Sequence, residues 1–255
     1  MLPNIVKSLL LLALQFQPTI QAPVEPNGIA PRGALPVRTI AGVTVVDTQI
    51  VRDAHEFARR HTSDWVYKHV MRTWLYGALI INSNATLKRS VDLEVHAVAV
   101  LLHDLGWDQT PNSTLISTDK RFEVDGAIAA REFIRSNKYG KKWEEIRVQR
   151  VWDAIALHTQ PGLYQYKEVD VKITGTGIIA DFLGSSNSIP QPEYDAIVKE
   201  FPSADLIPGT NETIIWLCQT KPNSTVDTWQ QVWGEHYVEN YSTKGLSIWD
   251  MLSGQ

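Results

Sequence analysis

The sequence predicts an all-α protein. Apolar residues recur at spacings of three and four in successive segments of the chain, which is the pattern of helices that each bury one face. No segment alternates between apolar and polar residues for long enough to require a β-sheet. The chain has 255 residues, of which 44% are apolar and nine are tryptophan, and this is enough for one large core. We therefore expect a single helical domain over residues 39–255.

The first 38 residues are expected to lie outside this domain. Lys7 precedes an apolar run from Leu9 to Phe16, and polar and small residues follow. This pattern is typical of a secretory signal peptide over residues 1–22, and the run is too short to span a bilayer. A buried N-terminal helix is the alternative. Four prolines and two glycines then predict an extended leader over residues 23–38.

Two further features agree with a secreted protein. The only cysteine, Cys218, excludes an intramolecular disulfide framework, so the core has to hold the fold together. Five of the ten asparagines begin an Asn-x-Ser/Thr acceptor for N-glycosylation. We expect a protein of the secretory pathway that is not stably inserted in a membrane after signal cleavage. The candidate glycosylation sites are Asn84, Asn112, Asn211, Asn223 and Asn240.

The charge balance narrows the range of partners. A formal net charge of −4 gives no basic excess for binding the phosphate backbone of a nucleic acid. We expect a small-molecule substrate and no nucleic acid. Whether the chain forms a homo-oligomer stays open.

Two helices are expected at the start of the domain. Helical spacing of apolar residues predicts the first over residues 48–61 and the second over residues 64–81. The second helix places His69 on one face with Arg72, three residues later. A lone histidine on a helix is more often a satisfied core group than a ligand, so the meaning of His69 depends on the polar residues that follow.

The third helix carries the residues around which we predict the site. It begins at Asp92 and ends with His103 and Asp104, just before Gly106. Two adjacent polar groups at the end of an apolar helix need a partner, and a cation is the simplest one. A polar stretch at residues 82–89 precedes the helix and is expected to form a surface loop. The buried stripe of the helix consists of Val91, Val95, Val98 and Leu102.

A fourth and a fifth helix are expected after a polar loop. Asp119 is the predicted cap of the fourth, which continues to about residue 136. The fifth covers residues 144–158 and has Ile155 on its buried face. His158, three residues later, points inward with it, and a buried histidine at a helix end needs a partner.

The next helical stretch, residues 173–183, contains a carboxylate on an apolar face. Asp181 lies one turn after Gly177, which leaves room for a neighbouring helix. An unpaired buried carboxylate is costly, so a metal is again the simplest partner. A helix from about residue 190 to residue 201 and two or three tryptophan-rich packing helices complete the prediction.

Taken in order, His69, His103, Asp104 and Asp181 resemble the metal ligands of the HD-domain superfamily. The resemblance spans roughly residues 48–184 and implies a helical bundle around one metal site, with the C-terminal packing helices as an addition. It also implies a divalent ion held by these four residues. Zinc is the first expectation, with iron or manganese as alternatives.

Two sequence stretches refine the resemblance. Residues 121–126 and 154–159 resemble the cyanamide-hydratase type found in fungi. Binuclear HD phosphodiesterases tend to have a further histidine where this chain has Phe122. The difference implies one metal ion and makes His158 a residue that lines the site.

The resemblance implies a metal-dependent hydro-lyase or hydrolase. Two imidazoles and two carboxylates leave a coordination position for water, and the metal lowers the pKa of that water towards neutrality. Asp104 is expected to take the proton of the water, and His158 or Glu123 to return one to the product. Arg72 is included among the catalytic candidates because a guanidinium one turn from a metal histidine suits a phosphate.

Three functions stay open. The first is hydration of a small nitrogen-rich substrate, nitrile-like or cyanamide-like, and Phe122, the aromatic surroundings and the lack of a lysine beside the motifs favour it. The second is metal-dependent hydrolysis of a small phosphate ester, which Arg72 favours. The third is a secreted binding protein without catalysis. The hydratase is the primary prediction.

Overall fold

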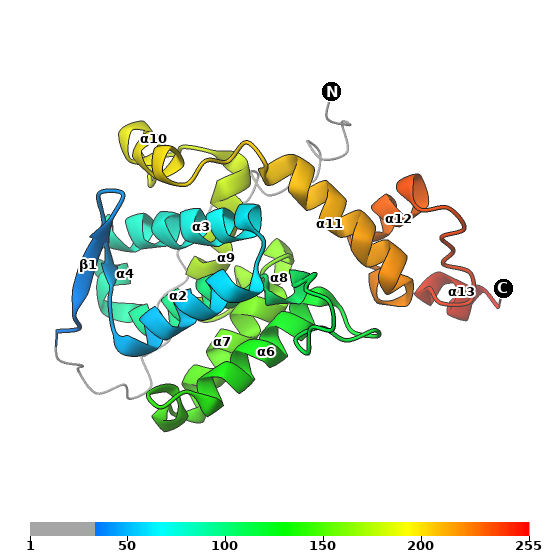
Figure 1. Ribbon diagram of the computed structural model, residues 1–255, viewed down its shortest axis with the longest axis horizontal. Coiled ribbons are helices and arrows are strands. Elements are labelled where there is room, and N and C mark those ends of the chain that lie inside the picture. Colours follow the sequence, from blue (N-terminus) through cyan, green and yellow to red (C-terminus); the bar gives the residue numbers. More distant parts are fainter. Residues whose placement is uncertain (1–33, 255) are drawn as a thin grey trace. The chain divides into compact units, whose positions relative to one another are not determined.

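The computed structural model describes residues 34–254 and confirms the all-α fold class (Figure 1). The predicted signal peptide and residues 23–33 of the predicted leader lie outside the described residues. In the described part of the chain, no helix is both long and apolar enough to cross a membrane. One compact unit begins at Leu35.

A two-stranded hairpin precedes the helices. β1 (Val37–Ile40) pairs antiparallel with β2 (Val43–Val46), and Ile40 is opposite Val43. The two residues between the strands, Ala41 and Gly42, have φ angles of 46° and 81°, and positive φ at both positions is what the common two-residue hairpin turn requires. Four residues per strand are too few for an alternating pattern to stand out in the sequence, so the hairpin is an addition to the predicted helices.

The bundle surrounds α5 (Leu93–Leu102), in which every residue from Val95 onward is buried. Asp92, where the helix was predicted to begin, caps it, because its side chain accepts hydrogen bonds from the backbone N–H groups of Glu94 and Val95. The helices that pack against α5 are α2 (Gln49–His61), α3 (Asp64–Asn82), α6 (Phe122–Ser136), α7 (Glu145–Leu157) and α9 (Val169–Leu183).

Two local predictions were wrong. The stretch predicted as a loop at residues 82–89 contains α4 (Ala85–Ser90), a short helix that buries none of its residues and therefore shows no apolar stripe in the sequence. Asn84 caps α4 by accepting hydrogen bonds at its side-chain oxygen. Asp119 does not cap α6, because that helix begins at Phe122, and the Asp119 carboxylate pairs with Lys120 instead.

Close approach of α3 and α9 brings two halves of the site together. A methyl group added at Gly177 would lie 2.9 Å from the carbonyl oxygen of Thr73 and 3.1 Å from the Cα atom of Gly77. Only a residue without a side chain fits at this crossing. The crossing lies one turn before Asp181 on α9 and two turns after His69 on α3.

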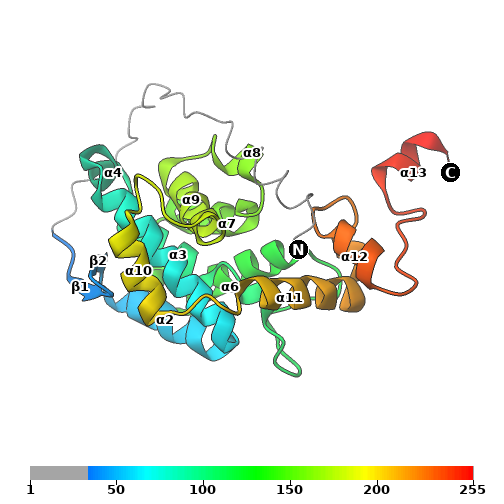
Figure 2. The ribbon, with the colours of Figure 1, turned by 90° about the horizontal axis from the view of Figure 1, so that it is seen from above.

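The remaining elements are short turns within the bundle and the C-terminal helices. Figure 2 shows α10 beside α3, with α11 continuing towards α12, and α11 also contacts α3. α13 buries none of its residues. These elements are η1 (Leu105–Trp107), η2 (Gly140–Lys142), α8 (Pro161–Tyr164), α10 (Gln191–Glu200), α11 (Leu206–Thr220), η3 (Pro222–Thr225), α12 (Gln231–Tyr237) and α13 (Ile248–Ser253).

Candidate metal centre

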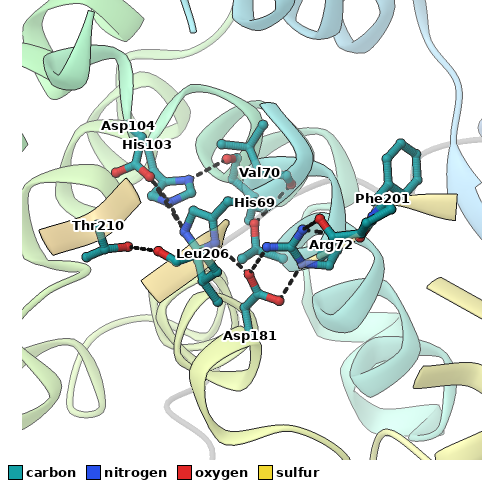
Figure 3. Close-up of polar contacts among 12 residues, drawn as sticks. His69, Val70, Arg72, His103, Asp104, Asp181, Phe201, Leu206 and Thr210 are labelled. Atoms are coloured by element: carbon teal, nitrogen blue, oxygen red, sulfur yellow. Dashed lines mark hydrogen bonds and ion pairs between the residues drawn. The ribbon is translucent and has the colours of Figure 1, made fainter. Parts of the chain in front are cut away.

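Helices distant in the sequence carry the predicted site residues to one place in the bundle (Figure 3). His69 lies on α3, and His103 and Asp104 directly follow the last residue of α5. His158 follows α7, and Asp181 lies in the last turn of α9. All five side chains belong to residues that are 7% exposed or less, so bulk solvent has little access to them.

Three of the four predicted ligands form a compact group. The Nε2 atoms of His69 and His103 are 3.3 Å apart. Asp104 Oδ2 lies 3.1 Å from His103 Nε2 and 3.5 Å from His69 Nε2. Tetrahedral zinc with bonds of about 2.0–2.1 Å to nitrogen separates two ligand nitrogens by about 3.3 Å. The spacing of the group therefore suits a metal ion.

The protonation of the two imidazoles supports the same reading. His103 Nδ1 lies 2.7 Å from the carbonyl oxygen of Val100, and a carbonyl can only accept, so this nitrogen carries the proton. His69 Nδ1 likewise donates to Asp181 Oδ2 at 2.7 Å. In neutral imidazoles the two Nε2 atoms are then left with lone pairs that face each other, which is the arrangement of two metal ligands.

Asp104 provides the clearest sign that a cation belongs here. The residue is 1% exposed, and neither of its carboxylate oxygens has a hydrogen-bond partner. A buried carboxylate without a donor is costly. The residues present thus fit a divalent metal ion.

Asp181 lies on the far side of His69 and is not part of the group of three. Its carboxylate accepts a hydrogen bond from His69 Nδ1 and two more from Arg72 Nε and Nη2, each 2.7 Å long. Burial would raise the pKa of Asp181, but these hydrogen bonds lower it overall. In this geometry Asp181 orients His69, as carboxylates commonly do behind metal-bound histidines. Its role as a fourth ligand stays a prediction.

Arg72 has a structural setting that its position in the sequence does not reveal. The residue is 1% exposed, and the Nε and Nη2 edge of its guanidinium group, its fork, donates both hydrogen bonds to Asp181. The remaining nitrogen, Nη1, donates to the carbonyl oxygens of Phe201 and Pro202 at 3.2 and 3.0 Å. Arg72 therefore ties Asp181 to the segment before α11 and has no free edge for a phosphate (Figure 3).

His158 faces the metal group from α7. Its Nε2 atom lies 3.7 Å from Asp104 Oδ1, and its ring centroid is 4.9 Å from that of His103. Nδ1 donates to the carbonyl oxygen of Ile155 at 2.7 Å, which leaves the Nε2 lone pair directed at the site. Burial, reinforced by nearby His103, lowers the pKa of His158 to about 4. At neutral pH this side chain is an uncharged proton acceptor.

The hydrogen bonds of Glu123 do not suit the role of proton donor that the sequence suggested for it. Its Oε1 atom accepts hydrogen bonds from Arg121 at 2.7 Å and from Thr159 at 2.6 Å. Burial opposes its ionisation, but Arg121 and Thr159 lower the pKa of Glu123 overall. Glu123 is therefore ionised at neutral pH and carries no proton to give. The structure leaves the predicted catalytic roles of Asp104 and His158 untested.

Aromatic rings close the rest of the site. Phe122 lies 5.6 Å from the ring of His158 and 5.2 Å from the ring of Trp107, and Phe182 lies 5.6 Å from His69, all as centroid distances. Sequence reasoning missed Phe182. It is adjacent to Asp181, but the sequence does not tell which ring of a helix faces a ligand on another helix.

The candidate glycosylation sites differ in exposure. Asn84, Asn112, Asn223 and Asn240 are exposed. Asn211 is only half-buried, but it lies within α11, and its side-chain oxygen accepts a hydrogen bond from Trp233 Nε1 at 3.0 Å.

A comparison with known protein families tests the resemblance to the HD-domain superfamily. The model of the HD domain matches residues 66–200, which is more than half of the chain. The chain belongs to the HD-domain family. The matched HD domain contains all four predicted ligands and runs from α3 to the end of α10. A search of curated proteins found no match, so the resemblance to the cyanamide-hydratase type has no support from either comparison and stays a prediction.

Proposed function

We propose that this HD-domain protein is a metal-dependent enzyme that adds water to a small uncharged substrate with a nitrile-like or cyanamide-like group. The observation that carries the proposal is the buried group of His69, His103 and Asp104, with a carboxylate that has no donor. A divalent cation held there, zinc in the first instance, supplies Lewis-acid activation of a water molecule.

The setting of Arg72 favours an uncharged substrate. A phosphate ester needs positively charged or multiple N–H donors to bind it. Arg72 is the arginine nearest to His69 in the sequence, and its hydrogen bonds go to Asp181, Phe201 and Pro202. The rings of Phe122 and His158 that face the site are uncharged at neutral pH.

The residues of the chain then have distinct tasks in a hydration. Water oxygen bonds to the nitrile carbon, and both hydrogens of the water end on the nitrogen, so that an amide forms without any change of oxidation state. Asp104 Oδ1, which has no hydrogen-bond donor, accepts the first proton. His158, whose Nε2 atom is 3.7 Å away, passes a proton to the substrate nitrogen. Glu123 keeps a negative charge close to His158 and favours its transient protonation.

Hydrolysis of a small phosphate ester is the second candidate. The HD family match favours it, because proteins with this domain are typically metal-dependent phosphohydrolases. In this chain the substrate phosphate would depend on the metal for most of its binding, since the Arg72 fork is occupied.

Parallel assays on the purified, metal-loaded protein test the choice. We expect conversion of cyanamide or a small nitrile that millimolar phosphate does not inhibit and that is lost with His103→Ala. Phosphomonoester hydrolysis that is lost with both His103→Ala and Asp181→Ala would replace the hydratase by the second candidate. His96→Ala is the control, because His96 is buried on α5 and its ring contacts Thr174, away from the metal group.

Secretion is part of the proposal. The apolar run before residue 22 and the acceptor sites at Asn84, Asn112, Asn211, Asn223 and Asn240 support it. Four of these asparagines are exposed, as a glycan requires.

A further inference from the structure

The metal group of His69, His103 and Asp104 is closed to solvent, since each of the three residues is 1% exposed or less. A substrate or a metal ion therefore has to pass a neighbouring side chain to reach the group. Two part-exposed residues border the site, Phe182 at the end of α9 and Thr159 after α7. They mark two candidate entrances.

The ring of Phe182 contacts a histidine of the metal group directly. Its centroid lies 5.6 Å from that of His69, and the two ring planes meet at 63°, which is an edge-to-face contact. His69 in turn contacts His103, with 5.2 Å between the ring centroids. The path from Phe182 to the metal group is therefore a single ring contact long.

Phe182 differs in its packing from Phe122, the other phenylalanine at the site. Phe122 is 1% exposed and belongs to the packed apolar cluster that contains Trp107. Phe182 is part-exposed, and within the described part of the chain it is not among the apolar side chains that pack against either core cluster. A ring outside a close-packed core changes rotamer more readily than a ring within one. Core packing therefore does not fix Phe182 against His69.

The end of α9 keeps Phe182 near the surface. Phe182 is the second-last residue of this helix, and Leu183, the last, is 41% exposed. Gly184 then ends the helix with φ 85° and ψ −159°, a conformation that is essentially restricted to glycine. No further turn of α9 follows Phe182, so the helix does not enclose its ring.

Hydrogen bonds hold the other candidate entrance closed. Thr159 Oγ1 donates to Glu123 Oε1 at 2.6 Å, and Arg121 Nη2 donates to the same oxygen at 2.7 Å. Glu123 is 0% exposed, so an opening there would leave a buried carboxylate without its donors, which costs more than the loss of a ring contact. Displacement of Phe182 costs less, because a phenyl ring has no N–H or O–H donor to lose.

We propose that Phe182 closes the entrance to the metal group and that its ring limits the substrate to small uncharged molecules. The position of the entrance goes beyond the proposed function, while the size limit rests on it. A molecule that passes an apolar ring loses part of its hydration, which costs a charged group far more than an uncharged one. A short nitrile is therefore favoured over a phosphate ester by its lack of charge and over an aromatic nitrile by its size.

Release of zinc from the zinc-loaded, full-length protein to EDTA tests the entrance without any turnover. In the wild type the rate should not depend on the EDTA concentration, because zinc has to leave the closed site before EDTA captures it. In Phe182→Ala the rate should rise with EDTA concentration and exceed the wild-type rate about ten-fold, which corresponds to a barrier lower by about 1.4 kcal/mol. Leu183→Ala is the matched control and should behave like the wild type. Helical circular dichroism and Tm should stay at the wild-type level in both variants.

The dependence on EDTA concentration separates an entrance from a structural role. A faster rate in Phe182→Ala that does not depend on EDTA concentration would mean that Phe182 only supports His69, and it would overturn the entrance. A concentration-dependent rate in Thr159→Val but not in Phe182→Ala would place the entrance beside Glu123 instead.

The size limit is tested by the ratio of kcat/KM for benzonitrile to that for acetonitrile, which should be higher in Phe182→Ala than in the wild type. An unchanged ratio would overturn the size limit. If EDTA reaches the zinc of Phe182→Ala but no nitrile is converted by any of the proteins, the entrance stands and the proposed reaction fails. If acetonitrile is converted while zinc release from Phe182→Ala matches the wild type, the reaction stands and the entrance at Phe182 is excluded.

Discussion

The hydrogen bonds of single residues determine what the metal centre can hold. His103, His158 and His69 each donate from Nδ1 to a fixed acceptor, so their Nε2 atoms are the ones left for the site. Two of these atoms and Asp104 form the compact group. Asp181 acts on the group through His69, which gives it a different expected phenotype from that of a direct ligand.

Replacement of the site residues should therefore have graded effects on metal content. We expect one metal ion per chain in elemental analysis of the wild type, and none in His103→Ala or Asp104→Ala. Asp181→Asn should keep the metal with about 10–100-fold lower affinity, because a neutral amide cannot fully replace the carboxylate charge that orients His69. Competition with a chelator measures this affinity.

Two outcomes of that experiment would contradict the description. Complete loss of metal in Asp181→Asn would make Asp181 a ligand, and two metal ions per chain would overturn the mononuclear site. His96→Ala should retain the metal, since His96 hydrogen-bonds to Thr174 and lies outside the group.

Replacement of Gly77 by alanine tests how tightly α3 packs against His96. A methyl group there would lie 2.4 and 2.5 Å from ring atoms of His96. His96 is 2% exposed and has little room to move. Gly77→Ala should therefore lower the free energy of unfolding by about 1–3 kcal/mol, as overpacking of a core does. Urea denaturation measures the change, and Gly162→Ala is the control because nothing lies within 4 Å of the added group.

At the level of elements, buried charges connect α5, α7 and α9. Asp92 at the start of α5 pairs with Arg147 of α7. Asp170 in the first turn of α9 accepts from the backbone N–H of Asp92 at 2.6 Å and from Arg150 of α7 at 2.9 Å. These contacts hold the starts of three helices together, at the end of α5 away from His103.

Because of Asp170, the free energy of unfolding should depend measurably on pH. Burial raises the pKa of Asp170 from its ordinary value to about 6. The folded state therefore holds the proton of Asp170 more tightly than the unfolded state does. The stability that this bound proton contributes is lost as the pH rises from about 4 to 6. The stability difference between the wild type and Asp170→Asn should fall over this interval and become constant above it.

Urea denaturation of both proteins at several pH values measures that difference. Carboxylates with lowered pKa values, such as Asp108, give the opposite slope in both proteins and cancel in the comparison. A difference that stays constant from pH 4 to 7 would mean that Asp170 keeps its ordinary pKa.

At the level of the whole molecule, the features that sequence predicts well are those encoded locally. The start of the third helix at Asp92 is a local signal, and the structure confirms it, since α5 follows directly after Asp92. The predicted single stripe of this helix is wrong, because every residue from Val95 to Leu102 is buried. Gly177, one turn before Asp181, correctly predicts a close helix approach. The hairpin and α4 are too short for a periodic pattern. The partner of Arg72 is 109 residues away along the chain, and sequence spacing alone cannot show such a pair.

The predicted secretion also concerns the whole molecule. It leads to an expectation for each candidate glycosylation site. A glycan needs an asparagine whose Nδ2 atom reaches solvent. Asn112, Asn223 and Asn240 are exposed. Asn84 is exposed as well, and it caps α4 through its oxygen, so a glycan on its nitrogen is compatible with the cap. Asn211 lies within α11 against Trp233 and is crowded.

Expression in a eukaryotic secretory host should therefore give a secreted glycoprotein whose apparent mass falls on glycosidase treatment. Replacement of each exposed acceptor asparagine by glutamine should lower the mass by one glycan, because the site is accessible. Asn211→Gln should leave the mass unchanged and serves as the internal control. A product that stays inside the cell without glycans would contradict the secretory prediction. A glycan on Asn211 alone would instead show that α11 is not packed against Trp233 when the chain is modified.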